Sequence, residues 1–178
     1  MESQKVHSLN IIGYHGTSVT AAMSILGTGF RYSRNEYDWL GDGVYFFQDA
    51  PLRAREWATR RYGDDAAVIG SVIRLEGCID LLDIGWVEVL TEAFEEYQVQ
   101  QLQLRQPLPR QSTGARRLDR AVVNYVVDVL AEAGEIVRTV RSTFSEGRPI
   151  FPDSALLDRS HVQVVVRDMA VVEDVWLI

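Results

Sequence analysis

Two short apolar segments near the N-terminus carry polar residues that a structural core does not need. The first is YHGTS at residues 14–18, and the second is GVYFF at residues 43–47. A histidine followed at once by glycine is notable, because glycine lets a backbone approach another group closely or adopt a positive φ. An amphipathic stretch and a polar, aromatic loop lie between the two segments. We therefore expect residues 13–47 to build a pocket for a flat, polar ligand.

Neither segment matches a standard catalytic motif. The sequence lacks the G-x-S-x-G turn of serine hydrolases, the Walker loop and the G-x-G-x-x-G fingerprint. No second histidine or acidic residue stands at metal-ligand spacing from His15, so we expect no metal site. Alone, His15 would be a core histidine beside a helix cap, and Tyr45 would be an ordinary strand aromatic. Only the combination of the two residues indicates a functional site.

The elements that must position these residues follow from periodicity. Residues 10–15 read as a strand, and Ser18 is a good N-cap for a helix that Gly27 and Gly29 end. Residues 31–42 form a polar loop, and residues 44–47 form a second strand with Tyr45 and Phe47 on one face. The apolar stripe expected for the first helix is Val19, Ala22, Met23 and Leu26.

A second helix begins around Asp49 and Pro51. Its arginines are expected to point outward: Arg53, Arg55, Arg60 and Arg61. Residues 67–75 are almost continuously apolar, which predicts a buried strand. Two helices then follow, with stripes in 86–97 and 118–130.

The C-terminal part begins with a strand at 136–140. A turn-rich loop covers 141–158, and an alternating strand covers 162–166. A last strand is expected at 171–178. This order predicts an α+β fold in one domain, residues 1–178.

Composition excludes several classes of protein. The chain has 178 residues, 24% of them charged, and a net charge of −7, which does not fit a dedicated nucleic-acid binder. Its one cysteine, Cys78, excludes an intrachain disulfide and suits a reducing compartment. No stretch approaches the ~18 apolar residues of a membrane span. We expect a cytoplasmic protein without a membrane partner.

The order of the motifs resembles the ADP-ribosyltransferases, in the branch of diphtheria toxin and the poly(ADP-ribose) polymerases. In that branch a strand ends in His-Gly-(Ser/Thr), a helix closes on Gly before an apolar residue, and Gly-x-Gly-(Ile/Val)-Tyr-Phe follows a donor-binding loop. Here the pieces are HGT at 15–17, ILGTGF at 25–30 and GDGVYF at 41–46. The resemblance weakens across residues 86–134. It implies a split β-sheet core with flanking helices and a cleft for NAD.

The resemblance also implies roles for individual residues. His15 would hydrogen-bond a ribose hydroxyl of NAD, Gly16 would offer backbone groups to the carboxamide, and Tyr45 would stack on the nicotinamide ring. The catalytic set would be His15, Tyr45 and Gln163. The residues expected to contact NAD are His15, Gly16, Thr17, Tyr32, Ser33, Trp39, Tyr45 and Phe46.

Gln163 departs from the family pattern, which places a glutamate near the start of the late strand. A carboxylate there accepts a hydrogen bond from the ribose 2′-hydroxyl and favours the developing oxocarbenium ion. Gln163 retains the hydrogen bond and loses the charge, and it cannot act as a general base. Glu146 or Asp153 from the late loop could substitute for it. Transfer of a single ADP-ribose is favoured over chain elongation.

Three alternatives remain open at this stage. The leading one is an NAD-dependent mono-ADP-ribosyltransferase that modifies a protein or nucleic acid, as a toxin or phage-defence effector with a neutralising antitoxin protein. The second is a catalytically silent module that binds NAD or ADP-ribose, and the third is a purely structural domain. Residues 105–120 carry five arginines, for which a solvated segment is preferred over an arm that contacts phosphates.

Overall fold

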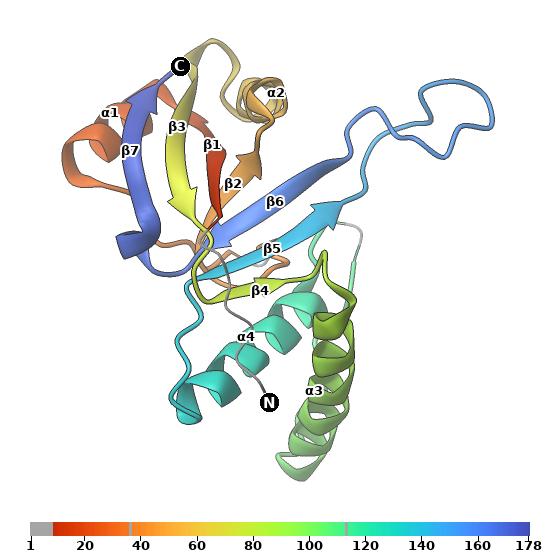
Figure 1. Ribbon diagram of the computed structural model, residues 1–178. Helices are drawn as coiled ribbons and strands as arrows, with labels where there is room; N and C mark the ends of the chain where they lie inside the picture. The colour runs from red at the N-terminus through yellow and green to blue at the C-terminus, as the bar shows by residue number, and fades with distance from the viewer. Residues whose placement is uncertain (1–8, 36, 113) are drawn as a thin grey trace.

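The computed structural model describes residues 9–35, 37–112 and 114–178, which form four α-helices and one mixed seven-stranded sheet (Figure 1). The predicted α+β class is therefore confirmed. The sheet order is β4-β5-β6-β2-β1-β3-β7, with β4 and β5 parallel and the other neighbours antiparallel. The strands are β1 (Asn10–Ser18), β2 (Val44–Gln48), β3 (Ala66–Arg74), β4 (Cys78–Asp80), β5 (Thr139–Phe144), β6 (His161–Val166) and β7 (Val172–Leu177). The helices are α1 (Val19–Thr28), α2 (Pro51–Tyr62), α3 (Ile84–Gln103) and α4 (Arg117–Glu132).

The sheet consists of two halves that meet over a short joint. β1 pairs with β3 along its whole length, from Asn10 to Ser18, but with β2 only through Gly13↔Gln48 and Tyr14↔Phe47. Beyond these two pairs the strands separate. One half therefore contains β1, β3 and β7, and the other contains β2, β6, β5 and β4, as Figure 1 shows.

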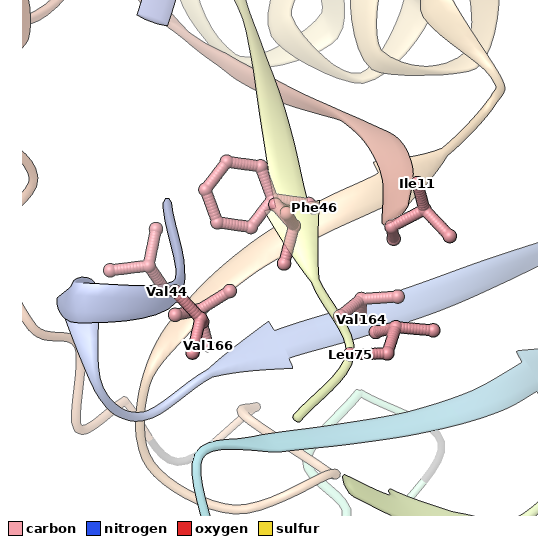
Figure 2. Packing of buried hydrophobic residues seen from close by; sticks show 8 residues of the cluster. Ile11, Val44, Phe46, Leu75, Val164 and Val166 are labelled. Atoms are coloured by element: carbon pink, nitrogen blue, oxygen red, sulfur yellow. The ribbon is translucent and has the colours of Figure 1, made fainter. Parts of the chain in front are cut away.

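An apolar core joins the two halves on one face of the sheet. Figure 2 shows Ile11 and Leu75 of the first half packed in the same cluster as Phe46 and Val164 of the second. Phe46 is 1% exposed, and Val164 is fully buried. Apolar burial of this kind contributes roughly 1.5–3 kcal/mol for each large side chain. The short joint between β1 and β2 is thus supported by side-chain packing.

The helices cover the halves differently. Ala22 of α1 packs with Ala67 and Ile69 of β3, while Ala54 of α2 packs with Val68, whose side chain alternates to the other face. Helices α3 and α4 cover the second half through residues such as Val123 and Val126 of α4. No helix in the described part of the chain is long and apolar enough to cross a membrane.

The apolar stripe predicted for α1 is wrong in three of its four members. Val19, Met23 and Leu26 are 47%, 60% and 41% exposed, and the helix buries Ala22 and Ile25 instead. The helix lies close to β3, where a small residue allows the approach, so the bulkier apolar side chains face outward. Local periodicity identified the helix but not its buried side.

The local signals for helix ends are confirmed except at Gly27, which was expected to end α1 with Gly29 but lies inside the helix. Ser18 caps α1 by accepting a hydrogen bond from the Ala21 amide at 3.2 Å. Gly29 ends the helix with a φ of 86°, a conformation that favours glycine. Pro51 is the first residue of α2, as the proline signal predicts.

The strand predicted at 136–140 lies further along the chain. β5 runs from Thr139 to Phe144 because it pairs with β6 throughout, including Ser142↔Gln163 and Phe144↔His161. The first residues of the predicted loop 141–158 therefore belong to the sheet. The remaining β5–β6 connection, residues 145–160, projects away from the body of the molecule in Figure 1.

Candidate functional site

A cleft of about 690 Å³ opens where β1 and β2 separate. Its walls come from β1, β2, β6, α2, the loop 31–42 and the start of the β5–β6 connection. A volume of this size is typical of sites for small molecules and cofactors. The second strand pair of the joint, Tyr14↔Phe47, marks the closed end from which the strands diverge.

Most of the predicted site residues line this cleft, although they come from distant parts of the sequence. Two do not: Thr17 is buried in the sheet at 5% exposure, and the Tyr32 hydroxyl donates to the Asp42 carbonyl at 3.0 Å on the outer side of the loop. The predicted residues that line the cleft are His15, Gly16, Ser33, Trp39, Tyr45, Phe46 and Gln163.

His15 is fixed at the edge of the core that joins the two halves. Its ring centroid lies 5.5 Å from that of Phe30 and 5.8 Å from that of Phe46. Its Nδ1 lies 2.9 Å from the carbonyl oxygen of Tyr45. Because a carbonyl only accepts, Nδ1 carries the proton, and Nε2 of the neutral ring has a free lone pair. His15 can therefore accept a hydrogen bond from a ligand hydroxyl.

The buried position of His15 predicts a pH effect on stability. Burial lowers the pKa of His15 below its usual 6.5, and the hydrogen bond to Tyr45 opposes this only in part. The unfolded chain therefore binds this proton first, and stability falls as the pH drops below 6.5. We expect His15→Phe to reduce this loss, which is at most ~1.4 kcal/mol per pH unit for one proton.

Urea unfolding of both proteins above and below pH 6.5 measures the effect. Burial also lowers the pKa of His161 and raises the pKa of Asp38. Both groups are present in the two proteins, so the difference between their unfolding free energies removes these contributions. Parallel pH profiles for the two proteins would contradict a lowered pKa at His15.

Gly16 is required by close packing between β1 and α2. A Cβ at this position would lie 2.6 Å from the carbonyl oxygen of Ala54 and 3.1 Å from the ring of Trp57. Because β1 has no described strand partner on the β2 side beyond Tyr14, backbone groups next to Gly16 also face the cleft. The glycine thus serves packing, and it leaves room for a ligand against the strand.

We expect Gly16→Ala to lower the free energy of unfolding by about 1–3 kcal/mol, since the clash involves backbone and an aromatic ring. Gly27→Ala is the matched control: it lies in α1, and an added Cβ would meet nothing within 4 Å. That control should be neutral or slightly stabilising. Urea unfolding curves compare the two variants, and equal midpoints would refute the close contact.

Tyr45 anchors the loop that forms one wall of the cleft. Its hydroxyl accepts from the Leu40 amide at 2.9 Å and donates to the Gly41 carbonyl at 2.9 Å. Burial raises the pKa of this hydroxyl, so it stays protonated. The ring lines the cleft. Tyr45 therefore orders residues 31–43 in addition to any contact it makes with a ligand.

Gln163 lies on β6 between Phe47 of β2 and Ser142 of β5. Its Oε1 accepts a hydrogen bond from Nε1 of Trp39 at 2.6 Å. The indole of Trp39 packs beside Phe144, with ring centroids 5.2 Å apart. The late strand and the loop 31–42 are thus connected directly in the cleft, although 124 residues separate the two side chains.

Asp38 is a cleft residue that sequence reasoning missed. It is 3% exposed, and its Oδ2 accepts from the Ser33 hydroxyl at 2.7 Å and from the Asn35 amide at 2.6 Å. Burial raises its pKa, while these hydrogen bonds oppose the rise. An Asp next to Asn and Ser in a loop is a signal for such turns. Asp38 holds the loop in shape together with Tyr45.

Arg53 corrects the predicted outward orientation of the α2 arginines. Its side chain is only 10% exposed and donates to Glu146 at 2.5 Å. It also lies 5.3 Å from the ring centroid of Phe47. The partner carboxylate comes from the β5–β6 connection, which the helical periodicity of α2 could not reveal. Of the two acids considered as substitutes for the missing glutamate, Glu146 lines the cleft, whereas Asp153 is exposed in that connection.

The cleft is basic in an acidic protein. Five arginines and two carboxylates line it, whereas the whole chain has a net charge of −7. Within the described residues, Arg31, Arg61 and Arg116 form no ion pair. The guanidinium of Arg116 lies 4.8 Å from the ring centroid of Phe144. Among the described residues its N–H groups donate no hydrogen bond, so they are available to a ligand in the cleft. This wall suits an anionic ligand such as a diphosphate.

The basic segment 105–120 divides between two roles. Arg116 lines the cleft, while Arg120 pairs with Asp42 at 2.7 Å. Arg105 and Arg110 are exposed. The preference for a solvated segment fits the exposed Arg105 and Arg110, while Arg116 is half-buried in the cleft wall.

Comparison with the known protein families finds no family that matches this chain, and comparison with curated proteins finds no significant match. Among the described residues, no three histidine, cysteine, aspartate or glutamate side chains gather as a metal site requires.

Proposed function

We propose that this protein is an NAD-dependent mono-ADP-ribosyltransferase with the split-sheet core of that family. It would transfer ADP-ribose from NAD to a protein or nucleic-acid acceptor and release nicotinamide. The observation that carries the proposal is the meeting of His15, Tyr45 and Gln163 in one cleft, from three different strands. These are the residues that the resemblance selects from the sequence.

The chemistry of the cleft supports NAD as the ligand. His15 Nε2 is free to accept from a ribose hydroxyl, and the backbone beside Gly16 faces the cleft. Unpaired arginines are available for the diphosphate, and the Tyr45 ring is available for the nicotinamide. A ribose hydroxyl, the diphosphate and the nicotinamide of NAD thus each have a complementary group on the wall of the cleft.

A catalytically silent module that binds NAD or ADP-ribose is the second candidate. Gln163 favours it, since an amide at this position gives no charge stabilisation to an oxocarbenium ion. Glu146, the cleft carboxylate that could substitute for the missing glutamate, is already paired with Arg53. Enzyme and binding module share the same donor site and differ only in turnover.

Labelled NAD separates the two candidates. Calorimetry measures NAD binding, release of nicotinamide measures cleavage, and label in a protein or nucleic-acid fraction measures transfer. We expect NAD binding, nicotinamide release and transfer of label. Binding without release or transfer would reject the enzyme, and no binding of NAD would reject both candidates.

The wider biology follows by analogy with compact transferases of this type. A small single-domain transferase that acts on a macromolecule would serve as a cytoplasmic toxin or phage-defence effector. An antitoxin protein that covers the cleft would then be its partner.

A further inference from the structure

The structure assigns Trp39 a positioning role: it turns the Gln163 amide so that its N–H groups, and not its carbonyl oxygen, face the cleft. The orientation of the amide follows from the contact alone. What it means for NAD depends on the proposed function.

The direction of the hydrogen bond between the two side chains is not ambiguous. An indole N–H can only donate, so the atom of Gln163 that lies 2.6 Å from Trp39 Nε1 is the carbonyl oxygen. The nitrogen and oxygen of a glutamine side chain are usually hard to tell apart. Here the donor-only partner decides between them.

Trp39 is itself fixed by several contacts, so it can orient the Gln163 amide. Its ring contacts Phe144, with centroids 5.2 Å apart, and the guanidinium of Arg116 at 5.6 Å; these two groups also contact each other at 4.8 Å. The next residue, Leu40, donates its amide to the Tyr45 hydroxyl at 2.9 Å. Tyr45, Trp39 and Gln163 therefore form one connected series across the cleft wall.

The opposite end of the amide faces the ligand. Within the described residues, Gln163 Nε2 forms no hydrogen bond, and the side chain lines the cleft. Two N–H donors thus meet the bound molecule. A ribose hydroxyl that accepts from Nε2 keeps its own proton free for another acceptor. The resemblance predicts that Gln163 accepts from the hydroxyl, whereas the contact with Trp39 leaves its N–H groups to donate.

The orientation of the amide changes which group of the sugar is recognised by Gln163. A glutamate in this position accepts from the sugar, whereas an oriented amide donates to it. Gln163 therefore selects an oxygen lone pair and fixes the sugar, and it adds no negative charge. Trp39 acts through Gln163 and does not need to touch the reacting atoms.

A double-mutant cycle tests this role. Trp39→Phe keeps an aromatic ring beside Phe144 and Arg116 but removes the indole N–H. We expect it to lower nicotinamide release about tenfold, in kcat more than in KM, because the amide is free to rotate. In the Gln163→Ala background the same change should cost less than about twofold. An equal cost in both backgrounds would overturn the positioning role.

A second measurement does not depend on NAD. The chain has four tryptophans, so an amide-correlation NMR spectrum holds four indole signals, and Trp39→Phe identifies one of them. Gln163→Ala should shift that signal and speed its exchange with water. Trp176→Phe is the matched control, since Trp176 lies on β7 against Gly70 in the other half of the sheet and should leave the Trp39 signal unchanged.

The outcomes separate the inference from the proposed function. A Trp39 indole signal that neither shifts nor exchanges faster in Gln163→Ala overturns the assigned contact, whether or not the protein binds NAD. A signal that responds, in a protein that does not bind NAD, supports the amide orientation and rejects the proposed function.

Discussion

Tyr45→Phe is expected to lower the free energy of unfolding by about 2–4 kcal/mol and to weaken NAD binding at least tenfold. The ring remains, but the Leu40 amide and the Gly41 carbonyl lose their common partner. An unsatisfied buried polar group costs about 1–3 kcal/mol. The loop 31–43 then loses its anchor, and the cleft loses the wall that contains Trp39.

Urea unfolding measures the stability of Tyr45→Phe, and calorimetry measures its affinity for NAD. Tyr14→Phe is the matched control, because Tyr14 packs against Phe47 without lining the cleft, and its hydroxyl makes no hydrogen bond among the described residues. That control should behave as wild type. Unchanged NAD affinity in Tyr45→Phe would mean that the loop does not contribute to the donor site.

Gln163→Glu is expected to raise the rate of nicotinamide release about 100-fold. One carboxylate oxygen would accept from Trp39, as the amide oxygen does at 2.6 Å, and the other would face the cleft. Preorganised electrostatic groups of this kind are worth roughly 10²–10³ in rate. The gain should disappear as the pH falls through the pKa of the new carboxyl group.

The matched control for this gain is Gln163→Ala, which removes the amide and adds no charge. It should release nicotinamide more slowly than wild type while unfolding at a similar urea concentration. A Gln163→Glu variant that is no faster than wild type would contradict an oxocarbenium ion near this residue. Gain in the alanine variant would contradict any role for the amide.

Signals that depend on neighbouring residues alone could be read from the sequence. Ser18 caps α1 and Pro51 begins α2 because caps and proline act over one helical turn. The alternation of β6 also holds, with Val164 and Val166 in the core that joins the halves and Gln163 on the cleft side. These features need no knowledge of distant segments.

The remaining features depend on partners that are far away in the sequence. Val19 is exposed because the packing against β3 decides which side of α1 is buried. Arg53 is covered because Glu146 arrives from the β5–β6 connection. The same reason explains why the Trp39–Gln163 contact was not foreseen, although both residues were named as candidates. The sequence thus predicted seven of the residues that line the cleft, but neither Asp38 nor the hydrogen bonds that connect the side chains.

Only two residue pairs join β1 to β2, whereas nine join β1 to β3. A rotation of one half against the other therefore strains few ladder hydrogen bonds, and the shared apolar core resists it instead. His15 and Gln163 lie on opposite sides of this joint. A ligand that contacts both residues would bridge the two halves, so its binding would restrict their relative motion.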